Sequence, residues 1–291
     1  MVLTLDQLDS ATKYPSIDTL HVLDERQRAT DALTEIGARF ADVDPRDHAH
    51  TEKVDGMGVR ILLLRSVHPP HALRDILTPL TCVANVRQED WIIGARDHLV
   101  AARGDRIPNP LEGVAERFGP IAERLLERWL IDSGTGPDIA LIAVYLEFYG
   151  GKIGRRAQHY AADGSRGCRA FDIRMMTADD CAAVVRMTVE EIASRREHGT
   201  LPGRWLFDDE RRAWCARFDI PHVPTLTVSR PIPTSPTDTL AWLHDVVGDR
   251  TRVAIGEHAP GRPEGVVVRT PDRSRIVKVA FDPYERALRA R

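Results

Sequence analysis

The sequence predicts a mixed α+β fold that is built on antiparallel sheets. Several short apolar runs have the length and composition of buried strands. They follow one another without regular crossover helices, and parallel strands need such crossovers. The chain contains no internal repeat and no low-complexity segment. We therefore expect antiparallel strands with flanking helices.

The individual elements can be assigned in order along the chain. Residues 1–50 are polar, and their pattern predicts mainly helical structure. The strand candidates are apolar runs bounded by turn residues, at 59–64, 81–86, 91–93, 139–149, 170–175, 265–269 and 275–280. The helix candidates have apolar periodicity or capping residues, at 111–131, at 177–196, and from Thr237 or Asp238 to Val247. Pro120 lies inside the first helix, where a kink or a restart is expected.

Composition limits the class of protein. The chain has 291 residues, of which 43% are hydrophobic and 29% charged, as in an ordinary globular domain. No apolar run approaches the roughly 18 residues that span a membrane, and no secretory signal precedes residue 30. The cysteines are scattered without a C-x-x-C pair, at Cys82, Cys168, Cys181 and Cys215. We expect reduced thiols in a cytoplasmic protein with no membrane partner.

Lysine is rare in this chain. Of 40 basic residues only four are lysines, namely Lys13, Lys53, Lys152 and Lys278. A lysine that persists among so many arginines suggests a need for an amine, because lysine can lose its proton and arginine cannot. Lys53 opens the sequence Lys-Val-Asp-Gly, just before an apolar run. By itself a K-x-D-G pattern recurs by chance, and a lysine in a surface turn is its commoner interpretation.

Four further motifs follow Lys53 in a fixed order, at 145–150, 171–173, 264–269 and 276–279. Together the five motifs resemble those of the covalent nucleotidyltransferases, which include polynucleotide ligases and mRNA capping enzymes. The ATP-dependent RNA ligases of the RNA ligase 2 type look most similar. The resemblance covers roughly residues 50 to 280. It implies a nucleotidyltransferase domain with antiparallel sheets and flanking helices around an ATP cleft.

The resemblance also implies a reaction in three steps. ATP adenylylates Lys53, the AMP passes to a 5′-phosphate of RNA, and a 3′-hydroxyl then attacks with release of AMP. A covalent lysyl-AMP divides one difficult step into two easier ones. Mg²⁺ or Mn²⁺ would offset the charge that develops on the phosphoryl oxygens.

By resemblance, Lys53, Lys278 and Glu264 are catalytic, and Glu147 and Glu264 bind the metal. The nucleotide-binding set is Glu52, Lys53, Arg96, Glu147, Phe171, Glu264 and Lys278. In this set Phe171 stacks on the base, Glu52 lies near the adenine, and Arg96 contacts ribose or phosphate. Judged without the family, Phe171 is an ordinary core residue and Glu264 an ordinary turn residue. Glu147, on a largely apolar strand, needs a partner or a ligand.

Two positions depart from the family pattern. Met57-Gly58 stands where these RNA ligases usually have Thr-Asn, and Ile276 stands where the first of two lysines is usual. A DNA ligase or a capping-type nucleotidyltransferase is an alternative, although capping enzymes tend to have Asp-Gly where this chain has Glu264-Gly265. So is a degenerate domain that binds nucleic acid without ligase activity.

The charge is unevenly distributed. The net charge is −3, yet residues 250–291 have more basic than acidic side chains. A basic segment on an acidic body fits a surface for phosphate backbones, and it also fits a solvated terminal helix. The short stretch after Lys278 leaves no room for an OB-fold. We therefore expect residues 1–291 to be a single catalytic domain that binds RNA or a nicked duplex, with a possible separate clamp protein.

Overall fold

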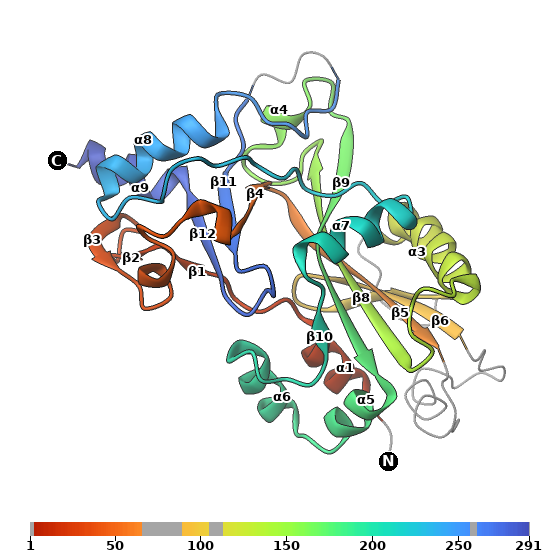
Figure 1. Cartoon of the computed structure of the whole chain (residues 1–291). Helices are drawn as coiled ribbons and strands as arrows, with labels where there is room; N and C mark the ends of the chain where they lie inside the picture. The colour runs from red at the N-terminus through yellow and green to blue at the C-terminus, as the bar shows by residue number, and fades with distance from the viewer. Residues whose placement is uncertain (1–2, 66–88, 105–112, 257–260, 291) are drawn as a thin grey trace.

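The computed structural model describes residues 3–65, 89–104, 113–256 and 261–290. Within these ranges the chain forms a sheet of six strands, a sheet of four strands and a small hairpin, with helices packed around them (Figure 1). All neighbouring strands are antiparallel except one short pair, β1 with β12. The predicted α+β class with antiparallel sheets is confirmed.

The larger sheet has the strand order β10-β9-β8-β5-β6-β7. Its strands are β5 (Met57–Arg65), β6 (Glu89–Ala95), β7 (Leu99–Ala102), β8 (Ile139–Gly150), β9 (Arg166–Thr177) and β10 (Arg204–Trp205). The central strands are buried on both faces, and their apolar side chains alternate between two separate cores.

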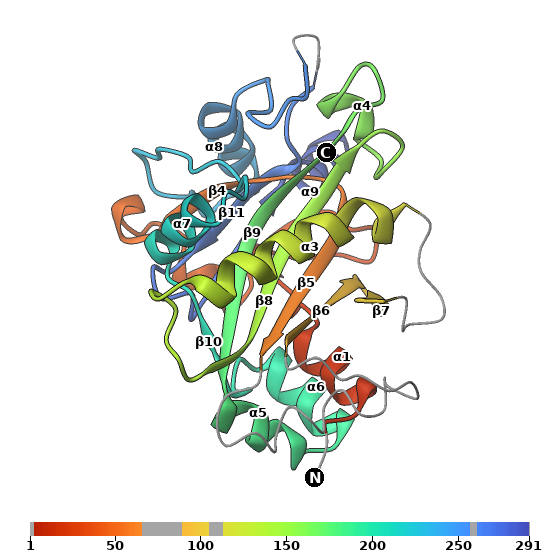
Figure 2. The ribbon, with the colours of Figure 1, turned by 90° about the vertical axis from the view of Figure 1, so that its right-hand side faces the viewer.

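Helices cover the two faces of this sheet unequally. On one face α3 (Val114–Ile131) lies across the strands, and α7 (Asp208–Arg217) packs beside it (Figure 2). On the other face, one end is covered by α1 (Leu5–Thr12), α5 (Ala178–Val185) and α6 (Val189–Glu197). The other end of that second face borders the cleft that is described below.

The smaller sheet has the order β1-β12-β11-β4. Its strands are β1 (Asp18–Thr19), β12 (Ile276–Ala280), β11 (Gly265–Arg269) and β4 (Ala49–Lys53). One face packs on a core that is formed with α8 (Pro236–Val247), α9 (Phe281–Arg289) and the hairpin of β2 (His21–Leu23) and β3 (Ala29–Leu33). A short helix, α4 (Ala157–Tyr160), packs beside β8.

Most of the predicted elements are confirmed, with changed ends. The expected strands at 59–64, 91–93, 139–149, 170–175, 265–269 and 275–280 are all present. The helix at 111–131 begins at Val114 and runs through Pro120 without a break. The strand expected at 81–86 lies outside the described residues.

Three expectations are wrong. Among residues 3–50 the structure has α1 as the only α-helix, and the other regular elements there are β1, β2, β3, the start of β4 and two 3₁₀ turns (Gly37–Arg39 and Pro45–Asp47). The helix at 177–196 is two helices, since Thr188 opens a second capping box with Glu191. The N-cap of α8 is Ser235, whose hydroxyl accepts the Asp238 N–H at 3.1 Å.

Two expectations from composition can be compared with the structure. In the described part of the chain, no helix combines the length and the apolar character needed to cross a membrane. Cys168, Cys181 and Cys215 are free thiols, as expected, and Cys82 lies outside the described residues.

Candidate functional site

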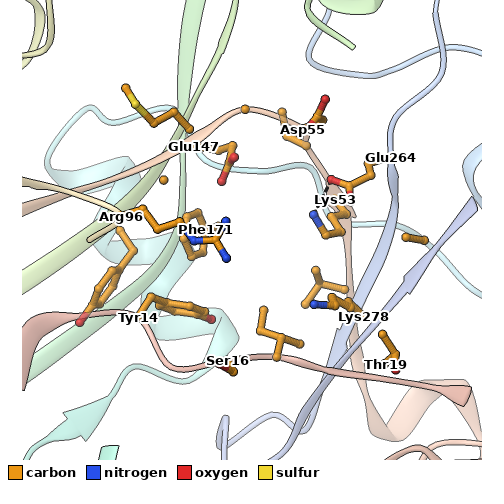
Figure 3. A pocket seen from close by; sticks show the side chains of 18 of the residues that line it. Tyr14, Ser16, Thr19, Lys53, Asp55, Arg96, Glu147, Phe171, Glu264 and Lys278 are labelled. Carbon is orange, nitrogen blue, oxygen red and sulfur yellow. Dashed lines mark hydrogen bonds and ion pairs between the residues drawn. The ribbon is translucent and has the colours of Figure 1, made fainter. Parts of the chain in front are cut away.

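A cleft of about 1120 Å³ lies between the two sheets. Figure 3 shows side chains from both sheets pointing into it. The smaller sheet contributes Lys53 and Lys278, and Glu264 directly precedes its strand β11. The larger sheet contributes Glu147 and Phe171. The cleft therefore brings together residues as far apart in sequence as Lys53 and Glu264, which are separated by 211 positions.

Lys53 and Glu264 form an ion pair at the centre of the cleft. Lys53 ends β4, directly opposite Gly265, the first residue of β11. The Lys53 Nζ lies 2.5 Å from the Glu264 Oε2, and the two side chains are 22% and 25% exposed. The Glu264 N–H also donates to the Lys53 carbonyl at 3.0 Å. Both charged groups are thus fixed by strand pairing and are still open to the cleft.

The Asp-Gly that follows Lys53 has a structural explanation. A Cβ on Gly56 would lie 2.3 Å from the Phe148 carbonyl oxygen, so the chain passes too close to β8 for a side chain. The Asp55 carboxylate accepts the Arg156 N–H at 2.9 Å, and the Asp55 N–H donates to the Tyr160 hydroxyl at 2.7 Å. These contacts hold the turn that presents Lys53.

Lys278 lies on β12 between β11 and β1, opposite Val267 and Thr19. Burial lowers the pKa of Lys278, and the positive charges of Lys53 and Arg96 lower it further against the opposing effect of Glu264. These cations therefore lie close enough to repel one another. An anionic group bound among them would relieve that repulsion.

Glu147 faces the cleft from β8, opposite Gly58 of β5. Burial raises the pKa of Glu147 to about 7, and the charges of Glu264 and Asp55 raise it while Lys53 lowers it. A Cβ on Gly58 would meet no atom within 4 Å, so the space at the strand position opposite Glu147 is open. The nearby positive charge of Lys53 is therefore too small to offset the burial of the Glu147 carboxylate and the negative charges around it.

The carboxylates suit a divalent cation that is shared with a substrate. Among the described residues, no group of three or more His, Cys, Asp or Glu side chains forms a ready metal site. Mg²⁺ in nucleotide sites usually binds one or two carboxylates and takes its other ligands from phosphates and water. Glu147 and Glu264 fit that pattern, because both line the cleft and the negative charge of Glu264 raises the Glu147 pKa.

Phe171 lies between the cleft and the core. Its ring packs edge-on against Tyr14 at 5.0 Å between centroids and is tilted against Tyr145 at 6.3 Å. One side of the residue is therefore anchored, while the side chain also lines the cleft. The core interpretation and the binding interpretation of Phe171 are compatible with each other.

Glu52 lies on the face of β4 opposite to Lys53. Its side chain is buried, and its carboxylate accepts hydrogen bonds from the Thr251 hydroxyl and from the Arg252 N–H, the latter at 2.9 Å. Burial raises the pKa of Glu52, and these hydrogen bonds oppose the rise. The carboxylate therefore anchors the segment around residue 251.

Arg96 is exposed in the turn between β6 and β7, at the edge of the cleft. The turn is held by Arg60, which the sequence analysis did not single out. The Arg60 Nη1 donates to the carbonyls of Ala95 at 2.7 Å and Arg96 at 3.3 Å, and Arg60 also pairs with Asp9 of α1. An arginine inside the apolar run at 59–64 was the available signal.

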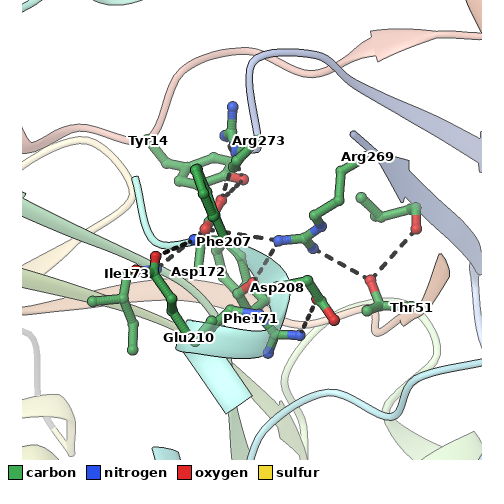
Figure 4. Close-up of polar contacts among 12 residues, drawn as sticks. Tyr14, Thr51, Phe171, Asp172, Ile173, Phe207, Asp208, Glu210, Arg269 and Arg273 are labelled. Carbon is green, nitrogen blue, oxygen red and sulfur yellow. Dashed lines mark hydrogen bonds and ion pairs between the residues drawn. The ribbon is translucent and has the colours of Figure 1, made fainter. Parts of the chain in front are cut away.

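No role was predicted for three other residues, namely Tyr14 and Arg269, which line the cleft, and Arg273, which is buried behind them. They surround Asp172, the residue after Phe171 (Figure 4). Arg269 and Asp172 belong to the motifs described above. Their contact joins strands of two different sheets, so it cannot be predicted from neighbouring residues in the sequence.

Comparison with known proteins identifies the family of this chain. The model of the RNA ligase family matches residues 46–280, which is most of the chain. The chain belongs to the RNA ligase family. No curated protein matches it.

Solved RNA ligases share its fold. Two apo structures of variants of the Naegleria gruberi RNA ligase match with a TM-score of 0.51 and 12% identity, over 97% of this chain and 59% of theirs. A third structure of that RNA ligase, with ATP and Mn, has a TM-score of 0.49 and 13% identity over 94% of this chain and 62% of its own. The chain thus spans about 59% of the length of the Naegleria chain.

Proposed function

We propose that this member of the RNA ligase family is an ATP-dependent RNA ligase that joins 3′-hydroxyl and 5′-phosphate ends through lysyl-AMP on Lys53. The observation that carries the proposal is the Lys53–Glu264 pair, 2.5 Å apart, with Lys278 beside it in a cleft between the sheets. The proposed cofactors are ATP and Mg²⁺ or Mn²⁺. The Naegleria RNA ligase, which has a similar fold, is known with ATP and Mn.

In the first step the Lys53 Nζ attacks the α-phosphorus of ATP. An N–P bond forms and the bond to pyrophosphate breaks, so the amine must first give up a proton. The Glu264 carboxylate is the nearest acceptor for that proton. Glu147 and Glu264 would hold a divalent cation together with phosphate oxygens, and the cation would offset the charge that develops on them.

Lys278 supplies the fixed positive charge beside the α-phosphate in this proposal. Ile276, two residues earlier, is on the same face of β12 but is almost completely buried. Arg275 falls on the opposite face by the same alternation, so it is a poor substitute for the missing lysine. Arg96, whose charge acts on Lys278, is the better second cation.

The binding roles follow the same geometry. Phe171 would stack on the adenine, Arg96 would contact ribose or phosphate, and the backbone around Glu52 would lie beside the base. RNA is the proposed substrate. In the next two steps the AMP of lysyl-AMP passes to its 5′-phosphate, and its 3′-hydroxyl then displaces AMP.

Incubation with [α-³²P]ATP and MnCl₂ tests the proposal. The wild-type protein should become labelled, and the label should resist alkali and be lost in acid, as a phosphoramide is. Lys53→Arg keeps the charge and should abolish labelling, because a guanidinium does not deprotonate. Chase of the labelled protein with nicked RNA and nicked DNA then compares the two substrates.

Two results would favour the alternatives. Labelling by GTP in place of ATP would favour a capping-type nucleotidyltransferase. A folded wild-type protein that binds RNA and never becomes labelled would favour a degenerate domain, for which Met57-Gly58 and Ile276 are the motivating departures.

A further inference from the structure

A buried polar cluster lies at the base of the cleft, and the mechanism above does not use it. The Asp172 cluster consists of Tyr14, Asp172, Arg269 and Arg273 (Figure 4). The Arg273 Nε and the Tyr14 hydroxyl both donate to the Asp172 Oδ2, at 2.8 and 2.7 Å. The Arg273 Nη2 also donates to the Tyr14 hydroxyl oxygen at 2.8 Å, which closes a ring of hydrogen bonds.

The cluster is buried and it joins three separate segments. The side chains of Asp172, Arg269 and Arg273 are 0%, 3% and 7% exposed. Asp172 lies on β9 of the larger sheet, whereas the arginines come from β11 and from the turn between β11 and β12. Tyr14 comes from the segment that links α1 to β1. The cluster is therefore a polar connection between the two halves of the site.

Arg273 adopts a backbone conformation that is costly for its residue type. Its φ is +61°, in the left-handed region that non-glycine residues seldom enter. From this position its guanidinium reaches Asp172 and stacks over the ring of Trp205, 4.3 Å from the centroid. Such strain persists where the surrounding contacts determine the conformation.

The contacts of the cluster converge on Phe171. Asp172 is its neighbour in the chain, and the Tyr14 ring packs against the Phe171 ring at 5.0 Å. The Arg269 Nη1 donates to the Phe171 carbonyl at 3.0 Å, and its Nη2 donates to the Thr51 hydroxyl at 3.3 Å. Thr51 is two residues before Lys53 on the same strand. Phe171 is thus held, through the cluster, at a set position relative to the strand of the nucleophile.

We propose that Tyr14 and Arg273 are positioning residues that act through Asp172 to hold the Phe171 ring against the base of ATP. This inference rests on the proposed function. A base-stacking contact contributes equally to the ground state and the transition state, so its misplacement raises KM and leaves kcat unchanged. A purely structural role would lower the melting temperature and leave KM unchanged.

Tyr14 and Tyr145, whose rings are in contact, offer a matched pair of variants. Tyr14→Phe removes one hydroxyl that donates to Asp172 and accepts from Arg273. Tyr145→Phe removes a buried hydroxyl from the adjoining ring, and that hydroxyl makes no hydrogen bond with any residue that the structure describes. Both changes keep the ring, so they differ only in the hydrogen bonds that are lost.

The test measures self-labelling by [α-³²P]ATP with Mn²⁺ as a function of ATP concentration, together with melting temperatures. We expect Tyr14→Phe to raise KM for ATP about 3- to 10-fold, the effect of one charge-assisted hydrogen bond, with kcat within about twofold. Arg273→Lys should raise KM further, because an ammonium group cannot reproduce the two directed contacts of the guanidinium. Tyr145→Phe should leave KM unchanged.

A double-variant cycle tests the route through Phe171. In a Phe171→Ala background, Tyr14→Phe should have no further effect on KM, because the ring that it positions is absent. Equal KM values for Tyr14→Phe and Tyr145→Phe would overturn the inference, and so would additive effects in the cycle. An unlabelled wild-type protein would instead refute the proposed function, and the inference with it.

Discussion

At the scale of single residues, the cleft combines acidic and basic groups whose charges are only partly balanced. Lys53 has Glu264 as a direct partner, whereas burial and neighbouring charges shift the pKa values of Lys278 and Glu147. A nucleotide triphosphate with a divalent cation carries the complementary charges for both. The shifted groups are therefore where substitutions should have the largest and most specific effects.

Lys278→Ala should reduce the rate of self-labelling by about 10²- to 10³-fold, the usual effect of removing one preorganised charge contact. Arg275→Ala is the matched control, since Arg275 is an exposed cation directly before β12 and does not line the cleft. Single-turnover labelling at saturating ATP gives both rates. A loss of less than about threefold for Lys278→Ala would transfer the role to another cation such as Arg96.

The raised pKa of Glu147 predicts a pH-dependent stability. Since burial raises this pKa from 4.5 to about 7, the folded state holds a proton that the unfolded state has released between these values. Stability should therefore fall as pH rises from about 4.5 through 7. Glu147→Gln removes this dependence. Its melting temperature without nucleotide and metal should exceed that of wild type by a few degrees at pH 8. At pH 4 the two should agree, and a constant difference across pH would contradict the assignment.

Phe171→Ala should weaken ATP binding by about 1–3 kcal/mol, the usual contribution of a base–aromatic stack. Phe171→Leu keeps much of the apolar volume and should preserve the fold, so it controls for the core role of the ring. Equilibrium dialysis with Lys53→Ala as the background separates binding from labelling. Unchanged ATP affinity in a folded Phe171→Ala protein would restrict Phe171 to the core.

At the scale of elements, α1 is tied to the strand that supports the cleft. Asp9 of α1 pairs with Arg60 of β5, and Arg60 holds the turn that carries Arg96. Asp9→Ala would leave a buried arginine without its carboxylate partner. We expect the free energy of unfolding to fall by about 3 kcal/mol or more. Lys13→Ala removes the other, partly exposed partner of Asp9 and should cost less than about 1 kcal/mol. Urea denaturation measures both values, and equal losses would contradict the argument.

The sequence predicts elements well where their signal is local. Short stretches of consecutive residues are enough to recognise the apolar runs of β5 and β8 and the periodicity of α3. The strand β1 has only two residues, and it exists because Asp18 and Thr19 pair with β12, far away in sequence. The same limit applies to the site. Motif order predicted that Lys53, Glu264 and Lys278 share a site, and all three line one cleft. Tyr14 and Arg273 meet only through contacts between distant segments, which no local pattern predicts.

At the scale of the whole molecule, the site consists of two rows of residues on two separate sheets. Under the proposed function, nucleic acid approaches along the opening between them, where Lys53, Arg96 and Lys278 supply positive charge for its phosphates. Contacts of this kind release counterions from the phosphate backbone, so their affinity falls with salt.

Sealing of nicked RNA should therefore fall steeply between roughly 50 and 200 mM salt, whereas self-labelling by ATP should change little. Labelling depends on a nucleotide held inside the cleft, which is screened less than a surface contact. Parallel titrations of both reactions on one preparation provide the comparison. Sealing that is insensitive to salt would argue for an enclosed RNA site.

The order of strands in the smaller sheet also determines when the candidate site can be assembled during synthesis of the chain. Lys53 is made long before its partners, because its strand β4 pairs with β11, which begins directly after Glu264, 211 residues later. At about 5–20 residues per second, the ribosome needs roughly 10 to 40 seconds to cover that distance. During this interval the nascent chain carries Lys53, the proposed nucleophile, on an unpaired strand edge, without Glu264 or Lys278. On the proposed mechanism, ATP therefore cannot label the chain until β11 and β12 emerge and fold between β1 and β4.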